Sequence, residues 1–187
     1  MRVITGTARG RVLETLDGEA VRPTTEKTKE AIFSAIHFDI EGRRVLDLFA
    51  GSGQLGIEAL SRGAEKAVFT DASQQSIDVV KRNVKKAGFE KQSVVCKTDY
   101  ASFLKGTRET FDIAFLDPPY AAGILSDALV LTCARMSEYG IIICEHPADA
   151  VLPENVGGFS VYRRYKYGKI VNVTIYKKSL EEVDAYE

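Results

Sequence analysis

The sequence predicts an α/β protein with a mostly parallel, seven-stranded sheet that ends in a C-terminal antiparallel hairpin. Strand and helix patterns alternate from residue 44 onward, and only Gly168 and its neighbours separate the last two apolar runs. Alternating strands and helices form a parallel sheet with helices on both faces, whereas two strands joined by a short turn pair as a hairpin. We therefore expect five parallel strands followed by two antiparallel ones.

Apolar runs and their spacing place these elements along the chain. The parallel strands are expected at 44–50, 67–71, 93–97, 111–116 and 140–145, and the hairpin strands at 159–167 and 170–177. A long helix is expected between Ser73, a favoured N-cap residue, and Gly88, a favoured C-terminal stop. Further helices are expected around residues 57–60 and along the spacing of Leu125, Leu129 and Met136.

The chain is expected to have three parts. Residues 44–178 form one folded domain, residues 1–43 a small hairpin-and-helix extension with Thr24 and Thr25 as helix caps, and residues 179–187 an acidic tail. The net charge is −1, but without the tail 25 basic residues face 22 acidic ones. The first eleven residues hold three arginines and no acid. A basic arm of this kind is compatible with an RNA partner.

Composition limits the class of protein. No apolar run approaches the roughly 20 residues of a membrane span, and the N-terminus lacks the apolar stretch of a signal peptide. The three cysteines, Cys96, Cys133 and Cys144, lack the paired spacing of a zinc site. We expect a soluble cytoplasmic protein with reduced thiols, no metal and no membrane contact.

A glycine-rich turn follows the first strand. Gly51, Gly53 and Gly56 match G-x-G-x-x-G, and Asp71 follows Gly51 by 20 positions at the end of the second strand. Such glycines allow close backbone approach to a cofactor, and such an acid binds ribose hydroxyls. NAD and S-adenosylmethionine both carry an adenosine ribose, so the motif alone does not separate them.

Two acidic positions favour the sulfonium cofactor. Asp47 ends the first strand, where a carboxylate suits a cationic amino-acid group and would repel a pyrophosphate. Asp99 follows the third strand, where it can accept a hydrogen bond from an adenine amine, and Tyr100 lies beside it. The residues expected to bind S-adenosylmethionine are Asp47, Phe49, Gly51, Gly53, Asp71, Asp99 and Tyr100.

The tetrapeptide Asp117-Pro118-Pro119-Tyr120 follows the fourth strand and is the expected catalytic motif. The two prolines fix the backbone and remove two N–H donors. The Asp117 side chain and the Pro118 carbonyl can then accept both hydrogens of an exocyclic amine, which aims its lone pair at the methyl group. Tyr120 can stack on the base. Most of the rate gain is expected from this alignment, without a metal.

With these motifs assembled, the sequence resembles the bacterial 16S ribosomal RNA guanine-N2 methyltransferase family (the RsmD type). The resemblance extends over nearly the whole chain and includes Arg9-Gly10-Arg11, Arg22-Pro23-Thr24, residues 47–53 and residues 117–120. It implies a Rossmann-like methyltransferase fold and a cytoplasmic, monomeric enzyme that acts on 16S rRNA in a partly or fully assembled small subunit. Gln54 and Thr70-Asp71 depart mildly from the family pattern.

The RNA-binding residues are expected in the N-terminal extension, close to the crevice. They are Arg2, Arg9, Arg11, Arg22 and Lys27, which would hold phosphates and deliver the base to Tyr120. The run from Tyr162 to Lys169 fits an RNA surface and a protected sheet edge equally well. His37 and His146 are interpreted as structural or solvated residues.

Three alternative functions remain open. One is another amino-group methyltransferase, acting on DNA adenine or protein glutamine, although the chain has no sizeable target-recognition domain. Another is a nucleotide-dependent oxidoreductase, which leaves residues 117–120 without a role. The third is an RNA-binding protein without catalysis, which the complete cofactor and tetrapeptide motifs disfavour.

Overall fold

The computed structural model describes residues 1–16, 26–120, 123–167 and 170–178. The helices in these ranges are α1 Glu26–Ala35, α2 Gln54–Ser61, α3 Gln74–Ala87, α4 Tyr100–Gly106 and α5 Leu125–Cys133, with 3-10 turns at His37–Asp39 and Glu90–Gln92. The strands are β1 Arg44–Asp47, β2 Lys66–Asp71, β3 Ser93–Lys97, β4 Phe111–Leu116, β5 Met136–Pro147, β6 Asn155–Val156, β7 Phe159–Tyr167 and β8 Val171–Lys178.

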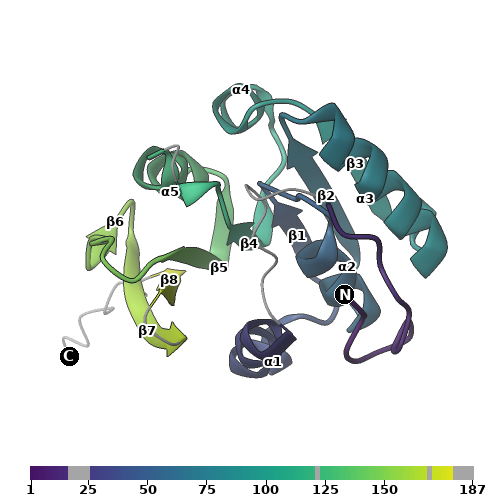
Figure 1. Ribbon diagram of the computed structural model, residues 1–187. Helices are drawn as coiled ribbons and strands as arrows, with labels where there is room; N and C mark the ends of the chain where they lie inside the picture. The colour runs from purple at the N-terminus through teal and green to yellow at the C-terminus, as the bar shows by residue number, and fades with distance from the viewer. Residues whose placement is uncertain (17–25, 121–122, 168–169, 179–187) are drawn as a thin grey trace, which may run out of the picture.

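The strands form an eight-stranded sheet in the order β3-β2-β1-β4-β5-β8-β7-β6 (Figure 1). Neighbours from β3 through β5 are parallel, and β8, β7 and β6 add antiparallel pairs at one side. From β1 the chain proceeds to β2 and β3 on one side, then returns to β4 and β5 on the other. The carboxyl ends of β1 and β4 therefore flank the switch point, where ligands bind in open α/β sheets.

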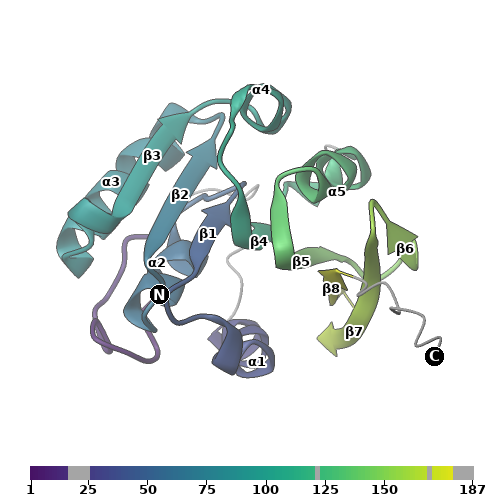
Figure 2. The ribbon, with the colours of Figure 1, turned by 180° about the vertical axis from the view of Figure 1, so that it is seen from behind.

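Helices cover both faces of the sheet (Figures 1 and 2). On one face, side chains such as Phe33 of α1 and Val80 of α3 share an apolar core with Phe115 of β4. On the other face, Leu104 of α4 and Leu129 of α5 pack with residues of the same strands. The order of layers is helix, sheet, helix, as the strand–helix alternation predicts.

Three details differ from the sequence-based expectation. The sheet has one strand more, because the two-residue β6 pairs with the start of β7. Met136 is the first residue of β5, where it pairs with Phe111, and is not part of α5. Its apolar side chain belongs to the same core cluster as Leu129 of α5, which explains the helix-like spacing. Helix α4 was not predicted, because seven residues are too few to show a helical period.

The N-terminal arm, residues 1–16, lies along α2 and α3. The expected hairpin is reduced to an isolated antiparallel bridge between Arg2 and Val12. The arm packs into the main core through Val3, Ala8 and Leu13, all of which are buried. Thr24 and Thr25, the expected helix caps, lie outside the described residues.

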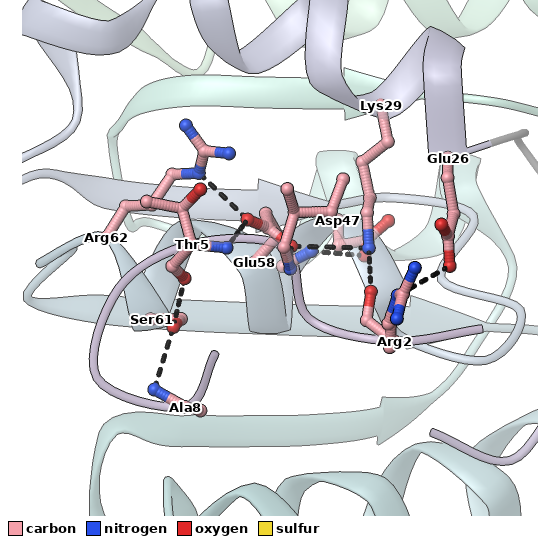
Figure 3. Close-up of polar contacts among 11 residues, drawn as sticks. Arg2, Thr5, Ala8, Glu26, Lys29, Asp47, Glu58, Ser61 and Arg62 are labelled. Carbon is pink, nitrogen blue, oxygen red and sulfur yellow. Dashed lines mark hydrogen bonds and ion pairs between the residues drawn. The ribbon is translucent and has the colours of Figure 1, made fainter. Parts of the chain in front are cut away.

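A buried ion pair attaches the arm and α1 to α2 (Figure 3). Lys29 Nζ lies 3.2 Å from Glu58 Oε2, and neither side chain is exposed to solvent. The Glu58 carboxylate also accepts hydrogen bonds from the backbone N–H groups of Ile4 and Thr5 and from Arg62 Nε. Lys29 Nζ donates to the Arg2 carbonyl at 2.7 Å. Burial, opposed by Glu58, lowers the pKa of Lys29.

Candidate active site

A cavity of about 540 Å³ lies at the carboxyl ends of the parallel strands. The segments after β1 through β4 all contribute to its wall, and so does the end of β5: residues 47–52, 71–73, 98–100, 117–120 and Glu145. Thr15 and Leu16, at the end of the arm, also line it. The strand ends that the sequence singled out are thus brought together in one hollow at the switch point.

The glycine-rich turn shapes one wall of this cavity. Gly53 has φ +78° and forms the N-cap of α2, a backbone conformation that other residues rarely adopt. It does not itself line the cavity, whereas Gly51 does. At Gly56 a β-carbon would lie 2.3 Å from the ring of Phe69, so glycine lets α2 pack directly on β2. The motif therefore serves both the turn and the packing of α2.

Asp47 lies beneath the turn, deeper than its expected role suggests. Its side chain is 2% exposed, and Oδ2 accepts a hydrogen bond from the Gly56 backbone N–H at 3.0 Å. Burial raises the pKa of Asp47 to about 7, against the opposing effect of the Gly56 bond, and the nearby Asp71 charge raises it further. A cation entering the cavity would favour the ionised form of this carboxyl group.

Asp71, at the end of β2, holds the backbone of two neighbouring segments. Its Oδ2 accepts from the Gly51 N–H at 2.9 Å and its Oδ1 from the Ser73 N–H at 2.8 Å. A carboxylate has about four lone-pair sites, so Asp71 retains acceptor capacity for a ligand hydroxyl in the cavity. It connects the turn after β1 with the segment after β2.

The segment after β3 has a clear structural role in addition to its place in the cavity wall. Asp99 is the N-cap of α4, and its Oδ1 accepts from the Ser102 N–H at 2.9 Å. This bonding from Ser102 lowers the pKa of Asp99. Tyr100 donates its hydroxyl to Asp127 at 2.9 Å, and its ring lies 5.7 Å from that of Phe49. The Phe49–Tyr100 pair, whose rings are tilted by 42° to each other, gives this wall an aromatic surface.

Gln54 is a polar cavity residue that sequence reasoning did not include in the site. Gln54 lines the cavity and is 8% exposed, and among the described residues its Oε1 has no hydrogen-bond partner. An unpaired buried acceptor is costly, so a donor from a ligand would relieve it. The available signal was the position of Gln54 directly after the glycine turn, where the sequence departs from the small residues of the family.

The tetrapeptide 117–120 forms a further part of the cavity wall. Asp117 is half-buried, Pro118 is buried, and both line the cavity together with Pro119 and Tyr120. The Tyr120 hydroxyl donates to Glu145 Oε1 at 3.3 Å. Glu145 was not predicted as a site residue, although it lies in β5 directly after the last residue paired with β4. The predicted catalytic motif and the predicted cofactor-binding turn thus line the same cavity.

None of the expected RNA-binding residues in the described ranges lines the cavity. Arg11 Nη1 donates to the carbonyl of Lys86, and Arg9 follows Ala8, whose N–H bonds to Ser61 at the end of α2. Lys86 is ten residues beyond Ser76, a cavity residue, or about 15 Å along α3. Arg9 and Arg11 therefore lie toward the far end of α2 and α3 rather than at the cavity, and their role in RNA binding stays a prediction.

Of the other expected RNA-binding residues, Arg2 and Lys27 are described, and both lie near the start of α1. Arg2 forms an exposed ion pair with Glu26 at 3.5 Å, and Lys27 is exposed in the first turn of α1. Arg22 lies outside the described residues. Gly168 and Lys169 of the expected basic hairpin run also lie outside them, whereas Arg164 of that run pairs with Glu154 at 2.7 Å.

The histidines and cysteines show no catalytic arrangement. His146 is buried and its two ring nitrogens contact Thr174 Oγ1 and the Pro147 carbonyl, while His37 is exposed. The three cysteines are free thiols, and burial raises the pKa of Cys133 to about 11. In the described part of the chain, no three His, Cys, Asp or Glu side chains are arranged to hold a metal ion.

In the same residue ranges, none of the helices has both the length and the apolar character needed to cross a bilayer.

Comparisons with known proteins agree with this geometry. A family model described as "Conserved hypothetical protein 95" matches residues 1–177. YlbH of Bacillus subtilis, provisionally named an rRNA methyltransferase, is 44% identical over 183 residues, covering 95% of this chain and 99% of that protein. Ribosomal RNA small subunit methyltransferase D of Haemophilus influenzae is 33% identical over 181 residues, covering 89% of this chain and 93% of that one. The chain belongs to the small subunit methyltransferase D family.

A solved structure supports the same assignment. An Escherichia coli protein, provisionally described as a methyltransferase, is 28% identical with a TM-score of 0.84, covering 97% of this chain and 99% of that chain. The family resemblance and the Rossmann-like methyltransferase fold predicted from the sequence are both confirmed. Within the methyltransferase D family fold, this chain places residues 117–120 and the glycine turn on one cavity.

Proposed function

We propose that this protein transfers a methyl group from S-adenosylmethionine to the exocyclic N2 amine of a guanine in 16S ribosomal RNA. One observation carries the proposal: a single cavity holds the amine-binding tetrapeptide 117–120, the glycine turn and Asp71. Relatives across most of the chain are named small-subunit rRNA methyltransferases, which supports an rRNA substrate.

The cavity fits an adenosylated amino acid. The unpartnered Gln54 Oε1 and the Asp47 carboxyl group can receive an ammonium group, and Asp71 can receive ribose hydroxyls. The Phe49–Tyr100 surface suits an adenine ring. Asp99 precedes Tyr100 and lines the same cavity, where it could accept a hydrogen bond from the adenine amine. When bound, S-adenosylmethionine supplies a methyl group activated by its positive sulfur.

The tetrapeptide would act on the nucleophile. The guanine amine is a poor nucleophile, because its lone pair is delocalised into the ring. Acceptors on Asp117 and the Pro118 carbonyl would hold both N–H bonds and favour a pyramidal nitrogen with its lone pair directed into the cavity. Tyr120 would stack on the base. The expected rate gain comes from this fixed geometry.

Asp71→Ala tests the cofactor site. We expect S-adenosylmethionine affinity to fall by roughly 1.5–3 kcal/mol, the range for hydrogen bonds to a charged group. Isothermal titration calorimetry measures it, with Asp78→Ala as a matched control, because Asp78 is an exposed acid on α3 that bonds Gln74 outside the cavity. Unchanged affinity would remove Asp71 from the site, and tight NAD binding would support the oxidoreductase alternative.

Asp47 predicts a pH dependence of cofactor binding. Its pKa in the protein without cofactor is about 7, and a bound cation lowers that pKa. At a pH between the pKa of the free protein and that of the complex, cofactor binding therefore releases a proton. Affinity is therefore expected to rise with pH, by at most about tenfold per unit, and to level off above pH 7. Calorimetry at pH 6, 7 and 8 measures this rise. Asp47→Asn should flatten it; an unaltered rise in that variant would assign it to another group.

We further propose that the protein acts as a cytoplasmic monomer on an assembling small subunit, with the basic arm on RNA phosphates away from the target base. Arg9→Ala/Arg11→Ala is expected to leave cofactor affinity unchanged and weaken binding to the ribosomal particle. The slope of log affinity against log salt should fall by about one for each arginine that no longer neutralises a phosphate. A variant that loses thermal stability but binds with wild-type affinity at every salt concentration would assign the arm a structural role only.

A mass-spectrometric inventory of modified nucleosides in 16S rRNA, with and without the gene, tests the function itself. We expect one N2-methylguanine to disappear with the gene and to return when the purified protein and S-adenosylmethionine are added to particles from the deletion strain. An unchanged inventory, or loss of a methyladenine instead, would overturn the guanine assignment.

A further inference from the structure

A second hollow adjoins the large cavity. It has a volume of about 150 Å³ and lies on the other side of residues 118–120. Pro118, Pro119, Tyr120 and Glu145 line both spaces, so these residues form the partition between them. The segments expected to bind the cofactor line only the large cavity, so the small hollow offers the tetrapeptide a separate space for a second substrate.

Glu145 is the acidic residue of this partition. In the parallel pairing of β4 with β5, Leu116 lies opposite Cys144. The next residues along the two strands are Asp117 and Glu145, so the two carboxyl groups arise side by side at the sheet edge. The Glu145 side chain is 5% exposed, and the Tyr120 hydroxyl donates to its Oε1. Tyr120, whose ring is expected to stack on the base, is therefore hydrogen-bonded to this carboxylate.

Position and chemistry together indicate what Glu145 contacts. Guanine carries its N2 amine directly beside the N1–H donor, on the same edge of the ring. If Asp117 and the Pro118 carbonyl hold the amine, an acceptor beside Asp117 faces N1. A carboxylate accepts hydrogen bonds and offers no proton in return. We propose that Glu145 accepts the N1–H of the target guanine and thereby selects guanine; this inference rests on the proposed function.

The same contact rejects adenine. The adenine amine is flanked by N1 and N7, which are both acceptors, so a carboxylate beside the amine would meet a lone pair. Sites built to hydrogen-bond a substrate group discriminate strongly against an analogue without it, because a buried polar group is then left unpaired. Tyr120 positions the acceptor, since its hydroxyl fixes Glu145 Oε1 while its ring remains available for stacking.

The test changes the contact on both sides: the base loses its N1–H donor, and Glu145 is replaced by glutamine. 2-Aminopurine keeps the N2 amine of guanine but has an acceptor at N1. Small-subunit rRNA is prepared by ligation so that the mapped target position carries either guanine or 2-aminopurine, and it is then assembled into particles. Methylation of these particles is measured under single-turnover conditions with wild type, Glu145→Gln and the control Glu154→Gln. Glu154 pairs with Arg164 outside both hollows. Calorimetry with S-adenosylmethionine verifies that each variant is folded.

In Glu145→Gln the amide can turn its NH₂ toward an acceptor. We therefore expect the variant to methylate 2-aminopurine faster than wild type does, and the preference for guanine to fall by on the order of 100-fold. Glu154→Gln should keep the wild-type preference. Equal losses on both bases in Glu145→Gln would overturn the proposal, and so would a wild-type enzyme that accepts both bases equally. Failure of the proposed function is distinct, because wild type would then leave guanine unmethylated.

Discussion

Asp117→Ala is expected to lower the rate of methyl transfer by on the order of 10² or more, the scale for removing a preorganised hydrogen bond to a reacting group. Affinity for S-adenosylmethionine should stay near the wild-type value, because the expected partner of Asp117 is the target amine. Asp117 is half-buried in the cavity wall, on a segment separate from the glycine turn and Asp71. Single-turnover kinetics with saturating cofactor and ribosomal particles measures the effect.

Asp117→Asn is the matched control for this experiment. Asparagine keeps one side-chain oxygen acceptor and the same size, so its rate should lie between those of wild type and Asp117→Ala. A near-normal single-turnover rate in Asp117→Ala would contradict the assignment. Equal defects in both variants, together with weaker cofactor binding, would indicate that the substitutions disturb the wall and do not remove an acceptor.

The parts of the site that sequence predicted share a simple physical origin. Asp47 and Asp71 are the last residues of β1 and β2, and Asp117 directly follows β4. The carboxyl ends of parallel strands meet at one edge of the sheet. Strand–helix alternation was therefore sufficient to predict that they come together. By the same reasoning Glu145, at the end of the apolar run of β5, could have been included. The glycine spacing located the turn but did not reveal that Gly56 packs against Phe69.

The parts that sequence reasoning missed depend on contacts between distant residues. Nothing in the spacing of Arg9 and Arg11 shows that the arm runs along α3, so the expectation placed them at the crevice. Asp99 was assigned to the cofactor because it follows a strand; its N-cap bond to Ser102 became evident only with α4. Lys29 and Glu58 are 29 positions apart in the sequence, and their pair joins α1 to α2. From the sequence alone, each residue would be interpreted as a solvated charge on a helix surface.

That buried pair gives the second large expected effect, in Glu58→Ala. The substitution leaves Lys29 fully buried without its anion and removes the acceptor of the Ile4 and Thr5 N–H groups. Loss of one partner of a buried pair costs about 3–5 kcal/mol, because the remaining charge is uncompensated. Chemical denaturation should show a lower unfolding free energy by this amount, with part of the loss offset if Lys29 releases its proton, as its lowered pKa allows.

Lys29→Met provides the opposite half of the comparison. Glu58 then still accepts from Arg62 Nε and from two backbone N–H groups, and methionine fills the apolar space of the lysine chain. The cost should therefore be smaller than in Glu58→Ala. The double variant Glu58→Leu/Lys29→Met should be more stable than Glu58→Ala, since it leaves no unpaired Lys29 charge, but less stable than wild type, because Ile4 N–H, Thr5 N–H and Arg62 still lose their acceptor. A Lys29→Met variant less stable than Glu58→Ala would contradict this order.

Because the arm fixed by Glu58 continues to Thr15 and Leu16 in the cavity wall, cofactor affinity should weaken in the same order as stability.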